Sequence, residues 1–192
     1  MAGSGFRLLE KNYIYLFHLD QFVILPTVPE TIQDSTSTTF SSTSIMGRSA
    51  PLFAYSYSGP RTMQITLNLH RDLMTQINYN VSNLKIDLSD DYVDTLIKYL
   101  QAMALPKYSN ASKMVDPPMI FLRLGNDIAI KGIIQGGVTT TYNLPLLSNG
   151  KYAQVSVSFN VSEVDPQDAS VVSVVGGFRG LDTSLERRIW KI

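Results

Sequence analysis

Side chains that could carry out chemistry are few in this sequence, and their spacing does not assemble a reactive site. The two histidines, His18 and His70, lie in an apolar run and at the end of an alternating segment, and neither has a partner at the spacing of metal ligands. No cysteine is present to supply a thiolate. No Gly-x-Ser-x-Gly segment follows an expected strand and opens a helix, so a nucleophile elbow is not indicated. We expect neither a metal site nor a Ser-His-Asp triad.

Two close pairs of carboxylates, Asp90 with Asp91 and Glu163 with Asp165, have the composition of an acid/base pair. The first pair fits the first turn of a helix, where the helix dipole favours negative charge. The second pair falls where a strand ends before a proline, and a solvated turn explains it more simply. The glycine-rich segment 176–180 lacks the lysine and hydroxyl residue that follow a phosphate loop. We therefore expect no enzymatic activity and no cofactor.

Composition favours one globular domain with a neutral surface. The 192 residues are 44% hydrophobic, which is enough for a sizeable core, and only 17% charged, with a formal net charge of zero. Sparse Lys and Arg argue against electrostatic capture of nucleic acid, and a net charge near zero favours self-association. The first residues lack the features of a signal peptide, and no apolar run approaches the roughly 18 residues of a membrane span. We expect a protein kept soluble in a cytoplasm, with no membrane contact.

The elements that would position any site are mainly strands. Residues 13–25 are rich in aromatic and β-branched residues and indicate one or two strands. Strict alternation over 61–70 and 152–162 predicts two half-buried strands. Their apolar faces consist of Met63, Ile65, Leu67 and Leu69, and of Val155, Val157, Phe159 and Val161. The aromatic residues of 13–22 and 53–57 have no interleaved basic residues, so we expect them in the core and not on a base- or sugar-stacking surface.

Further strands are expected in the second half of the chain. Segments 119–124 and 128–134 flank the turn sequence Gly125-Asn126-Asp127 and predict a hairpin. Gly136-Gly137 indicates a bulge or bend, after which residues 138–143 continue as a Thr-rich strand. The face of segment 152–162 opposite its apolar face is polar and uncharged over Gln154, Ser156, Ser158, Asn160 and Ser162.

One helix and an apolar tail complete the expected elements. Residues 90–104 have a single apolar stripe and the good N-cap Ser89, which together predict a helix lying against a sheet. Residues 176–192 carry apolar side chains at four-residue spacing, which predicts a short amphipathic helical tail that docks either on the parent domain or on a neighbouring molecule. The apolar residues of this tail are Leu181, Leu185 and Ile189.

A long polar extension is expected over residues 35–58. Ser35–Ser44 is Ser or Thr at every position except Phe40, and neither Pro nor Gly interrupts it. Because Thr favours extended backbone, we interpret 35–58 as a two-stranded extension, the alternative being a mobile surface loop. The whole chain then divides into one mainly β domain over 1–175, with the extension 35–58 and the helix 90–104, and the tail 176–192.

The order of these features resembles the small baseplate and tube-adaptor proteins of contractile phage tails, including the amino-terminal domains of adaptors that carry a LysM module. The resemblance covers most of residues 22–166. In the first half of the chain it is carried by an apolar strand ending in Pro26-Thr27-Val28-Pro29, by the polar stretch leading to Ile45-Met46-Gly47-Arg48, and by the strand 61–70. In the second half it is carried by Pro117-Pro118-Met119-Ile120-Phe121 and by the segment 132–142. The last part is Asn149-Gly150-Lys151-Tyr152, which runs into a strand that ends before Asp165-Pro166. No LysM-like repeat follows residue 166, so binding of peptidoglycan through such a module is not implied.

The resemblance implies a mainly β (α+β) fold: a tail-tube-like split antiparallel β-barrel or sandwich with one flanking α-helix and a long β-hairpin extension. It also implies a structural virion component that forms a homo-oligomeric ring, typically a hexamer, and joins the tail tube protein to the baseplate hub and wedge proteins, with DNA only as passing cargo. Such a protein would be assembled in the host cytoplasm and reside in the virion tail. We assign the extension to intersubunit contact, with the apolar anchors Phe40, Ile45, Met46, Leu52 and Phe53.

Two other functions remain open at the level of the sequence. A β-rich receptor- or carbohydrate-binding tail module would use the aromatic residues to line a groove, and its assembly would more naturally be trimeric. A hydrolase acting on peptidoglycan or another glycan would need a carboxylate such as Glu163 in its mechanism, and the sequence gives this function little support.

Overall fold

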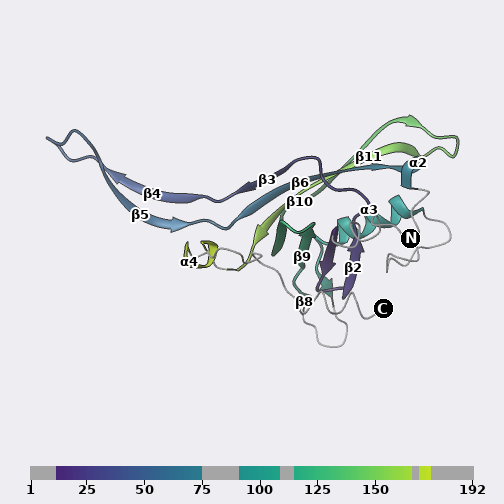
Figure 1. Cartoon of the computed structure of the whole chain (residues 1–192), viewed down its shortest axis with the longest axis horizontal. Coiled ribbons are helices and arrows are strands. Elements are labelled where there is room, and N and C mark those ends of the chain that lie inside the picture. The colour runs from purple at the N-terminus through teal and green to yellow at the C-terminus, as the bar shows by residue number, and fades with distance from the viewer. Residues whose placement is uncertain (1–11, 75–90, 109–114, 166–168, 174–192) are drawn as a thin grey trace.

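One antiparallel sheet of seven strands forms the body of the protein in the computed structural model, which describes residues 12–74, 91–108, 115–165 and 169–173 (Figure 1). The strand order is β2-β1-β9-β10-β11-β6-β3. The strands are β1 (Asn12–Leu16), β2 (Gln21–Ile24), β3 (Ile32–Ser35), β6 (Thr62–His70), β9 (Met119–Leu124), β10 (Ile128–Leu146) and β11 (Tyr152–Glu163).

Within the described ranges, two small sheets and three helices accompany the main sheet. The small sheets pair β4 (Thr38–Thr43) with β5 (Leu52–Ser58) and β7 (Lys107–Tyr108) with β8 (Val115–Asp116). The helices are α2 (Arg71–Met74), α3 (Tyr92–Ala102) and α4 (Ala169–Val172). The expected mainly β fold of the α+β class is therefore confirmed. No closed barrel forms among the described residues, because β2 and β3 end the strand order of the main sheet without pairing to each other.

The main sheet curves around a single core. The apolar side chains of β6 and β11 that alternation predicted to be buried are 0–3% exposed. They share one cluster with Val23 of β2, at the opposite edge of the sheet, and with Leu96 and Leu100 of α3. This cluster therefore extends across the strand order of the sheet, and α3 packs against it. Burial of this cluster is the main stabilising contribution to the fold.

Aromatic residues cover the other face of the sheet near its β1 end. Tyr13, Tyr15 and Phe121 are buried with Ala129 in a second cluster, against which Phe17 and Phe22 pack. Their neighbouring rings lie 4.5–6.1 Å apart, the range of favourable aromatic contacts. The expectation that the aromatic residues of 13–22 belong to the core is confirmed.

Helix α3 begins two residues later than the predicted range 90–104 and ends two residues earlier, at Ala102. Its N-cap is Asp91, whose carboxylate accepts a hydrogen bond from the backbone N–H of Asp94 at 2.7 Å. The prediction that Ser89 caps the helix is wrong, because Asp91 has the extended backbone and the oxygen acceptor that a cap needs. The predicted one-sided stripe is confirmed, since Val93, Leu96, Ile97 and Leu100 are all buried.

Strand β10 is one strand of 19 residues and not two shorter ones. Its pairing with β11 shifts register between Gln135 and Val138, where Gly136 and Gly137 both have positive φ. The two glycines therefore provide the predicted bulge, and the strand passes through it. The hairpin turn at Gly125 is also confirmed. The predicted tail 176–192, with Leu181, Leu185 and Ile189, lies outside the described residues.

Candidate interaction surfaces

A two-stranded arm projects from the body of the protein. Strands β4 and β5 pair with each other from Thr38↔Ser58 to Thr43↔Leu52, and they continue β3 and β6 away from the main sheet (Figure 1). This confirms the two-stranded extension predicted for 35–58. The chain here is Ser- and Thr-rich, and it stays extended because cross-strand hydrogen bonds pair its backbone.

The root of the arm is fastened to the body by polar contacts. Arg61 is 6% exposed and donates to Asp34 through Nε at 2.9 Å and Nη2 at 2.7 Å. The Gly59 backbone N–H donates to the carbonyl of Ser37 at 2.8 Å, and the hydroxyls of Ser35 and Thr62 lie 2.7 Å apart. A bidentate arginine–carboxylate contact fixes the relative orientation of the two side chains and also pairs their charges. The arm is therefore held in line with β3 and β6.

One face of the arm is aromatic. The register places Phe40 opposite Tyr55 and Ser42 opposite Phe53, so these four side chains share a face. The rings of Phe40 and Tyr55 meet edge to face at 5.7 Å. Phe40, Phe53 and Tyr55 are nevertheless 55%, 68% and 60% exposed. We call these three residues the aromatic face of the arm.

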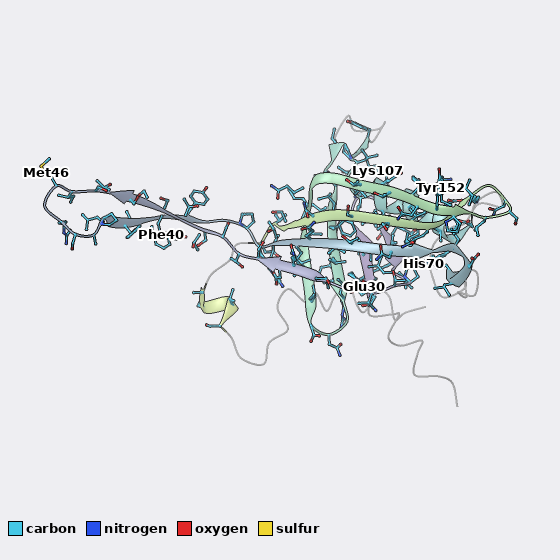
Figure 2. All side chains as sticks on the ribbon, turned by 90° about the horizontal axis from the view of Figure 1, so that it is seen from above. Glu30, Phe40, Met46, His70, Lys107 and Tyr152 are labelled. Carbon is cyan, nitrogen blue, oxygen red and sulfur yellow. The ribbon has the colours of Figure 1, made fainter. Side chains whose placement is uncertain are left out.

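The remaining predicted anchors lie elsewhere on the same arm. Ile45 and Met46 occupy its tip, where Met46 is fully exposed (Figure 2). Leu52 pairs with Thr43 on the face opposite the aromatic face. The structure thus brings Phe40, Phe53 and Tyr55 together and separates Leu52 from them.

The expectation that the aromatic residues of 53–57 lie in the core is wrong. Phe53, Tyr55 and Tyr57 belong to a two-stranded arm with no layer packed against it, and all three are exposed. Their alternation resembles that of a core strand, and only the position of β5 beyond the main sheet distinguishes the two. Sequence reasoning also missed Tyr55 as a member of the interaction surface.

A second surface is polar and uncharged. On β3, β6, β11 and β10 the side chains that point away from the core form rows across the sheet. One of these, the amide row, consists of Gln33, Gln64, Asn160 and Gln135. Neighbouring rows carry Thr66, Ser158 and Thr139, then Asn68, Ser156 and Thr141. No Asp, Glu, Lys or Arg stands in these rows, so the predicted uncharged face of 152–162 extends over neighbouring strands.

The described residues also contain a compact ion cluster that the sequence did not reveal. The Arg71 guanidinium is 6% exposed and pairs with both Asp91 and Asp94, and its Nε donates to the carbonyl of Tyr152 at 2.8 Å. Lys151 adds a second cation, 2.5 Å from Asp94. The cluster ties α2 and the N-terminus of α3 to the beginning of β11. Its members are up to 80 residues apart in sequence, and no local pattern connects them.

The charges in this cluster shift one another's pKa values. Partial burial would raise the pKa of Asp94, but hydrogen bonds from Arg71 and Lys151 outweigh it and lower that pKa to about 2. The hydrogen bond to Asp94 raises the pKa of Lys151. Burial opposes the charge of Arg71, and the two carboxylates still raise its pKa. Each of these groups is saturated by its neighbours, so the cluster fastens elements together and offers no unpaired charge to a ligand.

The residues weighed for catalysis are dispersed. His18 is buried with Nε2 3.2 Å from the carbonyl of Ala102, and His70 lies at the end of β6. Glu163 is the last residue of β11 and is buried, so its assignment to a solvated turn is wrong, whereas Asp165 is exposed. Over the described ranges, no cluster of three or more His, Asp or Glu has the geometry to hold a metal ion.

No protein-family model matches this chain, and no similar sequence was found among curated proteins. Within the part of the chain that the structure describes, no helix has the length and apolar character needed to cross a membrane.

Proposed function

We propose that this protein is a structural, non-enzymatic component of a phage tail that forms a ring and joins the tail tube to the baseplate hub. The observation that carries the proposal is the arm: a fastened, two-stranded projection whose aromatic face has no partner within the described residues. Contiguous exposed apolar side chains of this kind mark interaction surfaces in proteins. The resemblance of the sequence to tube adaptors and baseplate proteins supplies the biological setting.

A ring of identical copies would supply the missing partners. The main sheet leaves β2 and β3 as edge strands, and exposed edges favour pairing with another chain unless they are covered. A closed ring can cover such a surface with a different, complementary surface of the next copy, and a homo-hexamer is the size that the resemblance favours. Further partners in this proposal are the tail tube protein and the baseplate hub and wedge proteins, within a virion assembled in the host cytoplasm.

The uncharged polar rows suit a channel through which DNA passes. Retention of DNA depends on Lys and Arg neutralising its phosphates, and the amide row and its neighbours carry neither. Amide and hydroxyl groups keep such a wall hydrated without fixing the polyanion in place. We assign this face to the lumen, so that DNA is passing cargo and not a bound ligand.

The test of the proposal removes the arm and leaves the body intact. Replacing residues 39–57 by Asn-Gly joins the paired residues Thr38 and Ser58 through a two-residue hairpin turn. The intact chain should sediment as a particle of several copies, and the variant should remain a folded monomer whose circular dichroism spectrum still shows the β-structure of the main sheet. Assembly that persists without the arm would contradict its proposed role.

A receptor- or carbohydrate-binding tail module is the second candidate. It is favoured by the exposed aromatic residues of β5, because sugar rings stack on such side chains. A glycan array tests this candidate. If a monomeric or trimeric chain binds glycans on the array, and the Tyr55→Ser variant does not, the result supports this candidate over the ring.

A further inference from the structure

A second exposed apolar patch lies at the far end of the molecule from the arm. It comprises Tyr142, Leu144 and Leu146 near the end of β10 and Tyr152 at the start of β11, and we call it the hairpin-end patch. Leu144 is 72% exposed and Leu146 is 54% exposed. The rings of Tyr142 and Tyr152 lie 5.6 Å apart. The aromatic face and the hairpin-end patch are therefore two separate apolar surfaces on one chain.

We propose that the aromatic face of the arm docks on the hairpin-end patch of a second copy of this chain. This inference rests on the proposed ring and names the surface that receives the arm. The resulting contact joins two different surfaces, so it repeats from copy to copy and does not stop at a dimer. It either closes into a ring or runs on as a filament.

The arm cannot reach the hairpin-end patch of its own chain. Phe40 and Met46 lie at one end of the molecule and Tyr152 at the other, with the length of β6 and β11 between them (Figure 2). The contacts of Arg61 with Asp34, and of Gly59 with Ser37, hold the arm in line with the sheet. Two surfaces at opposite ends of a rigid body can meet only between molecules.

The two surfaces also match in chemistry. Arg48 is the one charged residue among residues 36–58, and Lys151 is the one charged residue among residues 139–153. Lys151 is already paired with Asp94. Arg48 lies in the turn between β4 and β5, away from the aromatic face itself, so contact would bury aromatic and aliphatic groups on both sides without placing an unpaired charge between them. A membrane surface suits the arm less well, because one arginine gives little attraction to anionic lipid.

The absence of cysteine in the natural chain allows a direct test. Ser42 shares the aromatic face with Phe53, whereas Ser41 pairs with Ala54 on the opposite face. A chain with Ser42→Cys is mixed with a chain carrying Leu144→Cys and oxidised gently. We expect a covalent 42–144 heterodimer, and no such product when Ser41→Cys replaces Ser42→Cys. A single chain carrying both Ser42→Cys and Leu144→Cys should give a ladder of covalent oligomers.

Other outcomes separate the failure of this contact from the failure of the ring. If the unmodified chain forms particles of several copies but no 42–144 link appears, the docking surface is wrong and the proposed ring stands. If the chain is monomeric and no link appears, both are wrong. A membrane partner is tested by co-sedimentation with vesicles of phosphatidylcholine and phosphatidylglycerol. If the chain binds these vesicles, loses that binding when the arm is replaced, and gives no 42–144 link, the proposed contact between copies is wrong and the arm binds a membrane instead.

Discussion

The Arg71 cluster shows how single side chains hold separate elements in place. Arg71 follows β6 and starts α2, Asp91 caps α3 and Asp94 lies in its first turn, and Lys151 precedes β11. A buried guanidinium with both carboxylates removed would be left without compensation, which commonly costs several kcal/mol. The cluster thus stabilises the join between the helix and the end of the sheet that carries the hairpin-end patch.

The Asp94→Asn variant should lose stability in a pH-dependent way. The pKa of Asp94 is lowered to about 2 from its ordinary value of 3.8, so its charge stabilises the fold fully above pH 4. That contribution falls as the pH drops from about 4 through 2. With allowance for partial solvent screening, we expect a loss of about 1–2 kcal/mol at neutral pH.

Thermal unfolding between pH 2 and pH 6 measures this effect. The difference in Tm between the natural chain and Asp94→Asn should shrink as the pH is lowered through this range. Asp127→Asn is the matched control, because Asp127 lies in the exposed turn of the β9–β10 hairpin. A difference in Tm that stays constant from pH 6 to pH 2 would rule out the ionic contribution of Asp94.

At the scale of elements, the arm is the feature on which the proposed self-association depends. Its aromatic face stays exposed because a two-stranded ribbon offers no second layer to cover it. The polar contacts at its root restrict its direction before any partner binds. A pre-ordered arm loses less conformational entropy on contact than a mobile loop of the same composition.

The Tyr55→Ser variant should weaken self-association by roughly 30-fold, because truncating a central aromatic residue of an interface often costs about 2 kcal/mol. Sedimentation velocity over a concentration series measures the change. Ala54→Ser, on the opposite face of the same strand, should leave association unchanged. Equal effects of the two substitutions would show that the aromatic face is not the contact surface.

Local patterns predicted the strands and helix α3 well, because alternation and an apolar stripe depend only on neighbouring residues. The alternation of 61–70 and 152–162 corresponds to the buried faces of β6 and β11. The ion cluster could not be predicted, since Arg71 and Lys151 meet their partners only after the sheet has formed. Burial of Glu163 was missed because it depends on the path of the chain around it.

At the scale of the molecule, the same alternation was interpreted correctly in the body and wrongly in the arm. Phe53 and Tyr55 alternate with small residues as core residues do, yet β5 leaves the main sheet and loses its covering layer. The overall shape, a curved open sheet with a long arm, is set by where strands extend beyond their neighbours. Sequence periodicity reports which face is apolar and does not report what lies against it.

Placing positive charge in the amide row should convert a passive wall into a DNA-binding one. Gln64→Lys with Asn160→Lys puts two ammonium groups on neighbouring strands of the uncharged face. We expect DNA binding that weakens steeply with added salt, measured by fluorescence anisotropy with a duplex oligonucleotide. Gln64→Glu with Asn160→Glu is the charge-reversed control. Salt-sensitive DNA binding by the natural chain would contradict the assignment of this face.

Electron microscopy of the purified protein tests the central claim most directly. The chain mass is 21.4 kDa, and the account predicts closed rings of about six copies in which each arm lies on the adjacent copy. Particles of a single chain with a free arm, seen at every concentration examined, would contradict the proposal that this protein is a ring-forming structural component of a phage tail.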